Sequence, residues 1–305
     1  MKIYQHWQGL DAGSVQASVA LGNFDGVHLG HQAVINLARN AAPLGIVTFE
    51  PHPREVFQPD APPFRLMNAE ARANRLAKLG VQHLYELPFD KALAGLSPEA
   101  FARDVLAQGL SVSHVVVGAD FCFGQGRAGK AQDLVNLGKT YGFAVTVADL
   151  VQHDGAEISS TAIRIALAQG RPRDAAAMLG HWHRIEGEVI HGEKRGRQLG
   201  YPTANMSVAG LHLPKLGVYA VRVVVLSGPQ AGSYIGAASL GVRPMFGANL
   251  PNLETFIFDF TGDLYGHHLS VALVDYLRPE LKFDGLPALM DQMAADCIRA
   301  REILS

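Results

Sequence analysis

The first 180 residues alternate short apolar runs with helical stretches. The runs are rich in β-branched residues and lie at Ser18–Leu21, Gly45–Phe49, His83–Leu87, His114–Gly118 and Phe143–Ala148. The segments between them are rich in Ala, Leu and Arg and predict helices at Ala33–Asn40, Ala69–Leu79, Pro98–Gln108 and Ala131–Tyr141. Strands that alternate with helices at this spacing form βαβ units around a parallel sheet. Because the runs contain few polar positions, we expect this sheet to be covered on both faces.

The pattern changes after two further helices, which are expected at Ser160–Gln169 and Arg173–Leu179. Alternating apolar and polar residues follow at Arg184–Ile190, Val218–Leu226, Ser233–Leu240, Glu254–Phe260 and Leu269–Tyr276. Short strands without intervening helices predict an antiparallel barrel. A last helix, Leu286–Ile303, carries one apolar stripe that suits packing on that barrel. The fold class is therefore α/β, with a Rossmann-like domain over residues 1–182 followed by an antiparallel β-barrel domain over residues 183–305.

Composition and charge narrow the class of protein. A chain of 305 residues buries enough surface to fold without disulfide bonds or a structural metal ion. Its two cysteines, Cys122 and Cys297, are far apart in the sequence. Residues 1–180 carry 15 basic and 16 acidic side chains and the remainder carries 11 and 12, so neither half predicts nucleic-acid binding. The chain has no long apolar run and no signal peptide at its start, so we expect a cytoplasmic protein without membrane contact. The oligomeric state is left open, and a homo-oligomer is compatible with the sequence.

A glycine-rich turn, Gly22–His31, follows the first predicted strand and opens a helix. Such a turn places free backbone N–H groups and the positive end of the helix at the edge of the sheet where phosphates bind. The turn matches neither the dinucleotide fingerprint nor the P-loop. His28 and His31 are three residues apart, so they face the same side and can donate to phosphate oxygens. The alternative is an ordinary turn with two incidental histidines.

A second helix start follows the fifth predicted strand, at Ile158–Arg164. Ser159 or Ser160 can cap this helix, and a capped surface helix is the simplest interpretation. The functional interpretation is a second phosphate-binding helix start, to which Arg164 adds a planar cationic group one turn in. Two such helix starts in one α/β domain favour the functional interpretation.

Together, these motifs resemble the nucleotidylyltransferase superfamily. With Thr48–Pro53 and Gly118–Gly124, the first 170 residues are similar to the FMN adenylyltransferase module of bacterial FAD synthetases. The resemblance implies that His28 and His31 are catalytic contacts to the ATP phosphates. It also implies two groups of binding residues: Gly22, Phe24, Asp25, Gly26, Gly30, Ser159, Ser160, Thr161 and Arg164 for ATP, and Asp120, Phe121 and Phe123 for the flavin.

The second half carries a further set of motifs. A Gly/Lys/Arg loop over residues 187–200 leads into Tyr201–Asn205, and alone its composition would predict a solvated turn. With the segments Leu216–Tyr219, Ser239–Gly247, Leu253–Phe260 and Leu277–Phe283 in this order, the region resembles the riboflavin kinase family. The resemblance implies a Greek-key barrel.

The kinase resemblance assigns roles to seven residues. It implies that Thr203 and Asn205 place Mg²⁺ and ATP, and that Glu254 accepts the proton of the riboflavin 5′-hydroxyl. It further implies a phosphate loop and a flavin contact, with Gly192, Arg197 and Gly200 in the loop and Arg243 at the flavin. Alternation along the strand places Glu254 facing inward, whereas the simplest interpretation is a surface carboxylate.

Together, the two resemblances imply a bifunctional enzyme that uses riboflavin, FMN and ATP with a divalent cation, Mg²⁺. Riboflavin is phosphorylated in the C-terminal domain, and FMN is adenylylated to FAD in the N-terminal domain with release of pyrophosphate. One alternative is a single live activity, because Cys122, Ser239 and Met245 differ from the residues common in these families. A second is a flavin-binding module without turnover. A third, transfer of AMP to a different phosphate, leaves the second domain unexplained.

Overall fold

The computed structural model describes the chain except at residues 12–15, 150–151, 154–155, 193–199 and 246–247. For residues 152–153, 156–157, 243–245 and 248–250 it describes the backbone alone. The chain divides into two compact units. The first unit is Met1–Pro62 with Arg72–Ile158, and the second is Pro63–Ala71 with Ser159–Ser305.

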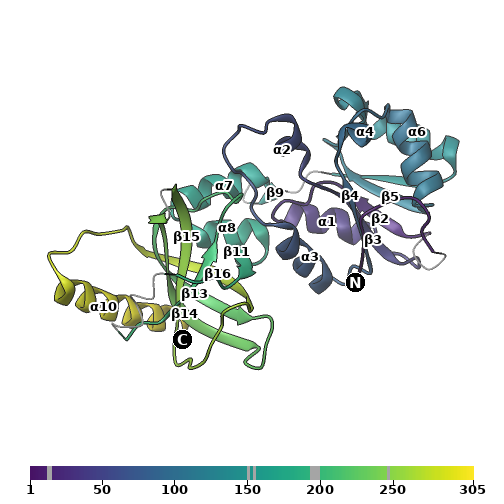
Figure 1. The fold of residues 1–305 in the computed structure, drawn as a ribbon. Helices are drawn as coiled ribbons and strands as arrows, with labels where there is room; N and C mark the ends of the chain where they lie inside the picture. Colours follow the sequence, from purple (N-terminus) through teal and green to yellow (C-terminus); the bar gives the residue numbers. More distant parts are fainter. Residues whose placement is uncertain (12–15, 150–151, 154–155, 193–199, 246–247) are drawn as a thin grey trace. The chain divides into compact units, whose positions relative to one another are not determined.

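The first unit contains a six-stranded parallel sheet in the order β1-β4-β3-β2-β5-β8 (Figure 1). Its strands are β1 (Lys2–Tyr4), β2 (Ser18–Leu21), β3 (Leu44–Glu50), β4 (His83–Pro88), β5 (His114–Gly118) and β8 (Ala144–Ala148). The direction of winding reverses between β2 and β5, as in other doubly wound sheets. Ligands of such sheets bind beyond the carboxyl ends of the strands at this reversal. The loops that follow β2 and β5 are therefore the expected binding loops.

Helices and short strands connect and cover this sheet. They are α1 (Leu29–Leu37), α2 (Pro53–Phe57), α3 (Ala69–Lys78), α4 (Lys91–Ala94), α5 (Pro98–Ala100), η2 (Phe101–Gly109), η3 (Gln125–Arg127), α6 (Ala131–Tyr141), β6 (Cys122–Phe123), β7 (Gly129–Lys130), β9 (Gln152–His153) and β10 (Ala156–Glu157). Alternate residues of β2 and β5 pack against η2 and α6, in a core that includes Leu21, Val117, Val105 and Leu134. Helix α1 contacts β2, β5 and β8. The sheet is therefore buried, as its apolar strands predict.

The second unit contains a six-stranded antiparallel sheet in the order β11-β16-β13-β14-β15-β12. Its strands are β11 (Arg184–Glu188), β12 (Thr203–Ser207), β13 (Gly217–Val225), β14 (Gly232–Met245), β15 (Ala248–Ile257) and β16 (His268–Arg278). The order β16-β13-β14-β15 is a Greek key, because the fourth strand returns beside the first. A bridge from Ile190 to Asn205 links the two edges of the sheet. The predicted fold class, including this barrel, is confirmed.

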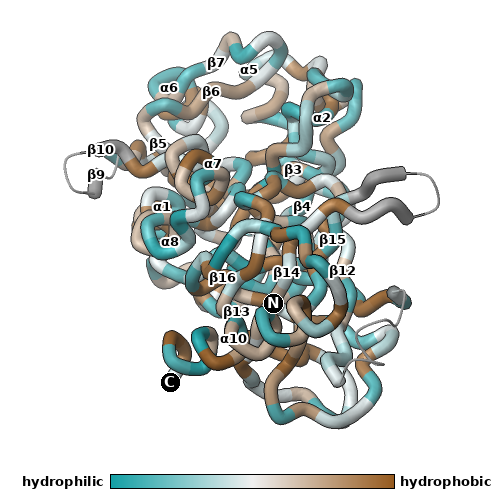
Figure 2. The backbone as a smooth tube through the Cα atoms, turned by 90° about the vertical axis from the view of Figure 1, so that its left-hand side faces the viewer, coloured by the Kyte–Doolittle hydropathy of each residue, from teal (hydrophilic) through white to brown (hydrophobic). Residues whose placement is uncertain are grey.

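The described part of the second unit also contains the helices α7 (Ser160–Ala168), α8 (Pro172–Leu179) and α10 (Leu286–Leu304). Hydrophobic and hydrophilic residues alternate along α10 (Figure 2), and its apolar side contacts β13, β14 and β16. The units defined by contacts thus group α7 and α8 with the barrel, whereas the boundary near residue 182, which rests on the change in sequence pattern, stays a prediction. Within the described residues, no helix has the length and apolar character needed to cross a membrane. The cytoplasmic location and the lack of nucleic-acid partners also stay predictions.

Candidate active sites

The Gly22–His31 turn leaves β2 at the reversal point of the parallel sheet and ends in helix α1. Phe24 and Val27 both have positive φ angles, of 53° and 44°. These angles are unfavourable for side chains of this size, above all for the β-branched Val27, and such strain concentrates at functional sites. Asp25 and Gly26 lie between them and are buried. The turn therefore holds its polar groups in a fixed geometry against the end of the sheet.

His28 and His31 form a stacked pair at the start of α1. Their ring centroids are 3.6 Å apart, and His28 Nδ1 accepts a hydrogen bond from the backbone N–H of His31 at 3.3 Å. This bond makes His28 the N-cap of the helix and assigns the ring proton of its neutral form to Nε2. Gly30 makes the stack possible, because a Cβ at this position would lie 3.1 Å from the His28 ring.

Burial keeps His31 neutral. Removal from water is the largest cause that lowers its pKa well below the ordinary value, and the charge of His28 lowers it further. Its Nδ1 atom is shielded and has no hydrogen-bond partner among the described residues. A neutral imidazole has one N–H donor and one acceptor. The Nδ1 atom of His31 is thus a ring nitrogen at a helix start with no hydrogen-bond partner among the described residues, and an oxyanion ligand could supply one.

The loop after β5 lies beside this turn at the sheet edge, because β2 and β5 are neighbours. Asp120 is exposed, whereas Phe123 is buried in the core and Phe121 stacks on it with ring centroids 5.7 Å apart. Cys122 is half-buried, and its Sγ donates to the Asp120 carbonyl at 3.5 Å. Of the three predicted flavin contacts, the structure therefore gives Phe123 a packing role and leaves Asp120 accessible.

The Thr48–Pro53 segment is held from within the first unit. Arg72 makes ion pairs with Glu50 at 2.9 Å and with Glu86 at 2.6 Å. His52 Nδ1 accepts from the backbone N–H of Arg54 at 3.1 Å and caps α2. His52 is therefore a capping residue in this structure.

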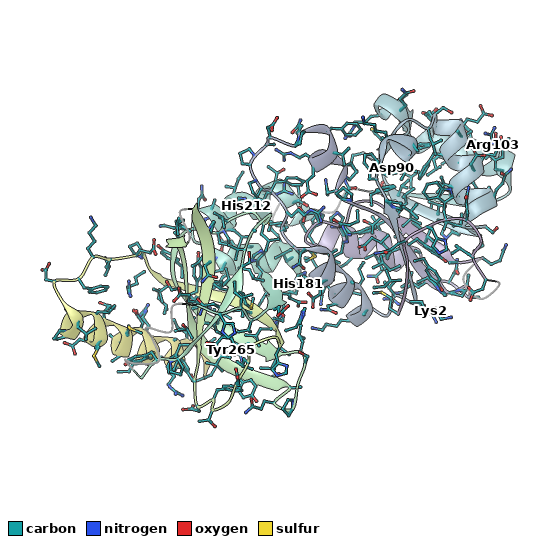
Figure 3. The ribbon with its side chains drawn as sticks, in the orientation of Figure 1. Lys2, Asp90, Arg103, His181, His212 and Tyr265 are labelled. Atoms are coloured by element: carbon teal, nitrogen blue, oxygen red, sulfur yellow. The ribbon has the colours of Figure 1, made fainter. Side chains whose placement is uncertain are left out.

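The second predicted helix start belongs to the second unit. Ser159 caps α7, and its Oγ accepts from the N–H of Ala162 at 3.2 Å. Arg164 Nε donates to the carbonyl of Phe64 at 2.6 Å, and the guanidinium lies 5.4 Å from the Phe64 ring centroid. His212, labelled in Figure 3, reaches the carbonyl of Arg164 at 3.0 Å. Helix α7 is thus anchored to residues of its own unit, while Thr161 is exposed at its start.

The predicted kinase residues come together on one face of the barrel sheet. Asn205 of β12 and Ser239 of β14 lie directly opposite Glu254 of β15, one on each side. Leu253 and Thr255 point the other way, into the barrel core. The expectation that Glu254 faces inward is therefore wrong, because strand alternation puts it on the outer face. Thr203, two residues before Asn205, lies on that same outer face.

Asn205 is fixed in orientation. Its Nδ2 donates to the carbonyl of Thr203 at 3.2 Å, and its Oδ1 accepts from Asn252 Nδ2 at 2.8 Å. A Cβ on Gly192 would lie 2.6 Å from Asn205 Nδ2, so only glycine fits at this position of the loop. The predicted phosphate loop and the predicted metal-binding residue thus meet at one point. Gly200 is exposed, and Arg197 lies outside the described residues, as does the side chain of Arg243.

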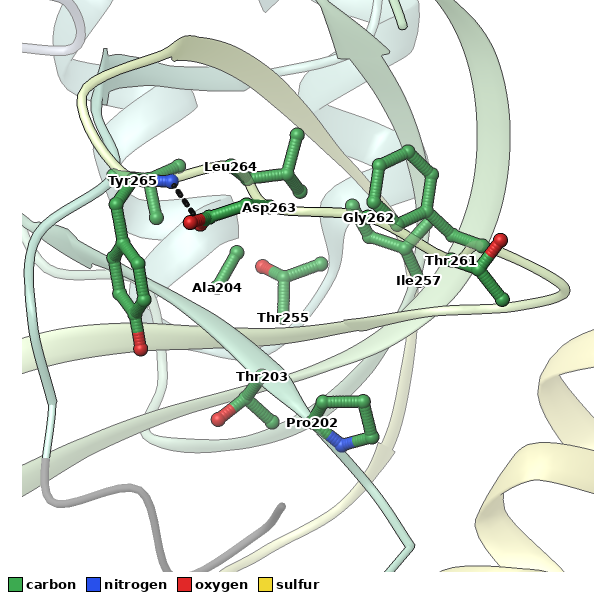
Figure 4. Close-up of a pocket in the computed structure, with 12 residues that line it drawn as sticks. Pro202, Thr203, Ala204, Thr255, Ile257, Thr261, Gly262, Asp263, Leu264 and Tyr265 are labelled. Carbon is green, nitrogen blue, oxygen red and sulfur yellow. Dashed lines mark hydrogen bonds between the residues drawn. The ribbon is translucent and has the colours of Figure 1, made fainter.

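A pocket of about 350 Å³ opens beside Thr203 (Figure 4). Its lining is Val189, Pro202, Thr203, Ala204, Thr255, Ile257, Phe260, Thr261, Gly262, Asp263, Leu264 and Tyr265. The ring of Tyr265 stacks against His191 with centroids 3.9 Å apart. Apolar walls with a few polar groups are typical of small-molecule sites.

Comparisons with known proteins agree with this geometry. A sequence profile described as FAD synthetase matches residues 11–162, and one described as riboflavin kinase matches residues 179–304. A protein of Pseudomonas fluorescens described as a bifunctional riboflavin kinase/FMN adenylyltransferase is 41% identical and covers 93% of this chain and 91% of its own. The Escherichia coli K12 protein of the same description is 38% identical with the same coverage. The chain belongs to the bifunctional riboflavin kinase/FMN adenylyltransferase family. The predicted pair of activities is thereby confirmed.

One solved structure extends this similarity to the whole fold. It comes from Streptococcus pneumoniae, is described as a macrolide-efflux protein, and is 32% identical with a TM-score of 0.81. The alignment covers 97% of this chain and 96% of that one. The family and this fold similarity therefore include both units.

Two residues of the barrel site were missed by the sequence analysis. Asn252 contacts Asn205, and Thr255 lies on the pocket side of β15 next to Glu254. The signal that could have found Asn252 is its two-residue spacing from Glu254, which places both on one face of a strand. Within the described parts of the chain, no group of three His, Cys, Asp or Glu side chains could hold a metal ion.

Proposed function

We propose that the outer face of β12 and β15 is the riboflavin kinase site. The observation that carries this proposal is the strand register, which sets Asn205 directly opposite Glu254. Kinase chemistry needs a carboxylate at the attacking hydroxyl and oxygen ligands at the metal of Mg–ATP, in adjacent positions. Glu254 would take the proton of the riboflavin 5′-hydroxyl while that oxygen attacks the γ-phosphorus of ATP, and ADP would leave.

Thr203 and Asn205 suit Mg²⁺ by the chemistry of their donors. Mg²⁺ prefers oxygen ligands and is commonly held by a few protein groups together with substrate phosphates. Asn252 donates to Asn205 Oδ1 and keeps that oxygen on the outer face. When bound, the ion would neutralise charge on the ATP phosphates. Gly192, Gly200 and Arg197 belong to the loop that we propose covers those phosphates, with Arg243 at the flavin.

The pocket next to Thr203 gives the nucleotide a place for its base. Its apolar walls suit a flat heteroaromatic ring, and its polar rim at Thr203 adjoins the proposed phosphate position. ATP would thus run from the pocket to the outer face.

We propose that the Gly22–His31 turn binds ATP for the adenylyl transfer. An FMN phosphate oxygen would attack the α-phosphorus of ATP, and pyrophosphate would leave. The protein supplies no nucleophile, so its contribution is alignment and charge stabilisation. His28 and His31 would donate to phosphate oxygens, and Gly22, Phe24, Asp25, Gly26 and Gly30 would shape the cradle.

The remaining predicted residues complete this second proposal. Asp120 and Phe121 would lie at the flavin, with Phe123 packed behind them. The role of Ser159, Ser160, Thr161 and Arg164 at the β/γ end of ATP stays a prediction from the sequence. Mg²⁺ would serve here too, because the few basic residues of this region cannot alone align the triphosphate of ATP with the phosphate of FMN. On this view, residues 1–182 carry the adenylyl step and residues 183–305 carry the kinase step.

A chromatographic time course tests the proposal. Purified protein is given riboflavin, ATP and Mg²⁺, and riboflavin, FMN and FAD are separated. FMN that appears first and then converts to FAD is the expected result. FMN that accumulates without conversion would contradict the adenylyl assignment under these conditions. Bound flavin that never changes would contradict both and favour a flavin-binding module.

A further inference from the structure

Thr255 has an unusual position in the pocket. Its side chain is fully buried, and its Oγ1 has no hydrogen-bond partner among the described residues. Buried hydroxyls are paired in most proteins, and leaving one unpaired is unfavourable. Thr255 also lines the pocket, where Figure 4 draws it in the middle of the lining residues. A hydroxyl in such a place is explained if a ligand supplies the missing partner.

The neighbours of Thr255 leave room for that ligand. Ala204 on β12 and Ala238 on β14 lie directly opposite Thr255, one on each side. Their small side chains keep the space around the hydroxyl open. The nearby walls are apolar, with Val189, Ile257 and further residues of the lining. The Thr255 hydroxyl is therefore a polar group set deep among apolar surfaces.

The chemistry of the ligand follows from the two faces of β15. Glu254 lies on the outer face, where the riboflavin hydroxyl is proposed to react, and Thr255 lies on the opposite face. Thr203, the proposed metal residue, lines the same pocket as Thr255. A ligand with phosphates at Thr203 would therefore place its base, not the flavin, at Thr255.

We propose that Thr255 is a specificity-determining residue of the kinase step, whose hydroxyl hydrogen-bonds to the polar edge of the adenine of ATP. This inference rests on the proposed kinase site. The hydroxyl can donate to a ring nitrogen or accept from the amino group. It contributes to ATP binding and takes no part in the chemistry.

The test compares Thr255→Val with the unchanged enzyme. Valine keeps the shape and removes the hydroxyl, so the KM for ATP in FMN formation should rise about five- to tenfold, as for loss of one neutral hydrogen bond. The kcat and the KM for riboflavin should stay within about twofold. Thr255→Ser, which keeps the hydroxyl, should restore the KM for ATP. Thr140→Val makes the same chemical change on the exposed surface of α6, outside the pocket, and should leave both KM values unchanged.

Adenine analogues locate the bond. Purine riboside triphosphate and the 1-, 3- and 7-deaza forms of ATP are each compared between the two enzymes. The analogue that lacks the atom contacted by Thr255 should have the same KM with the unchanged enzyme and with Thr255→Val. If no analogue removes the difference, the hydrogen bond to the base is disproved. If the KM for riboflavin changes instead of that for ATP, the pocket belongs to the flavin and the inference fails.

Stability without ligand separates this role from a structural one. Because Thr255→Val removes an unpaired buried hydroxyl, the Tm of the ligand-free chain should rise by about 1–3 °C. A fall in Tm together with an unchanged KM for ATP would show that the hydroxyl supports the fold. Absence of FMN formation by the unchanged protein would refute the proposed kinase function itself, whereas normal FMN formation with unchanged KM values would refute only the role of Thr255.

Discussion

The Gly22–His31 turn and the outer face of the barrel sheet position their polar groups by different means. In the turn, ten consecutive residues form the site, and unfavourable φ angles at Phe24 and Val27 hold its shape. On the barrel face, the groups come from residues about 50 positions apart, and only the pairing of β12 with β15 brings Asn205 to Glu254. The turn depends on local backbone conformation, and the face depends on strand register.

This difference predicts different sensitivities to substitution. A strained turn at a helix start positions N–H donors, so loss of one side chain leaves the backbone donors in place. A sheet face presents single side chains at fixed spacing, so each one is less easily replaced. The barrel site should therefore lose more activity than the turn when one of its polar side chains is removed.

The largest effect is expected from Glu254→Gln. The change keeps the size of the side chain and removes the proposed proton acceptor, so FMN formation should fall about 10²–10⁴-fold. FAD formation from added FMN should continue at the normal rate, because the adenylyl residues are unchanged. Both rates are measured by chromatography. Equal loss of the two activities in a folded variant would contradict separate sites.

A smaller effect is expected from His31→Ala in the turn. Loss of one donor to the ATP phosphates should lower FAD formation from FMN about 10²-fold, while riboflavin phosphorylation is retained. Circular dichroism serves as the folding control, because the ring also packs on His28 and Phe24. An equal fall in kinase activity would contradict the assignment of His31 to the adenylyl step.

The same contrast explains what the sequence could predict of the fold. The strands of the parallel sheet were predicted to within about one residue, because apolar runs such as His114–Gly118 are continuous and bounded by turns. Strand β1, with only three residues at the sheet edge, carries no such run. Strand β12 was not predicted as a strand, since apolar and polar residues alternate only weakly over Thr203–Ser207. A helix was predicted at Pro98–Gln108, but the π-helical conformation of Phe101–Gly109 leaves no signal in the pattern.

For the proposed sites, the sequence pattern indicates which segments carry the candidate residues and not how their side chains are oriented. The turn was placed correctly at the sheet edge because the strand before it and the helix after it fix its position. Glu254 was given the wrong face, because alternation shows which residues share a face and not which face is covered. The pattern shows neither the pairing of Asn252 with Asn205 nor the missing partner of Thr255, since both depend on neighbouring strands.

Gly192→Ala tests the close approach on which the barrel site depends. The new Cβ would collide with the Asn205 amide, so Asn205 should move and the KM for ATP in the kinase step should rise about tenfold. Gly187→Ala is the matched control, because its Cβ would meet no atom within 4 Å. A normal KM for ATP in Gly192→Ala would show that the loop can move away without cost to binding. FAD formation from FMN should be unaffected by either change.

The last prediction concerns stability: substitution of His183 should change the free energy of unfolding little at neutral pH and clearly in acid. This residue is buried in the second unit, where its Nε2 contacts the Leu66 carbonyl at 3.0 Å, and burial lowers its pKa to about 4. In the unfolded chain the pKa is about 6.5, so between about pH 6.5 and pH 4 the unfolded state binds a proton that the folded state does not bind. Stability should therefore fall as the pH drops from about 6.5 to 4, by about 3 kcal/mol in total.

His183→Gln removes this titration and keeps an N–H that can reach the Leu66 carbonyl. Its free energy of unfolding should change by about 1 kcal/mol or less at pH 7.5, and should decline less steeply than that of the unchanged protein towards pH 4.5. Denaturant unfolding in a Trp7→Phe background isolates the fluorescence of Trp182, which packs in the second unit. All other titratable side chains are the same in the two proteins, so the difference between the two pH profiles reports His183 alone. Parallel profiles would mean that burial does not hold His183 neutral in the folded state.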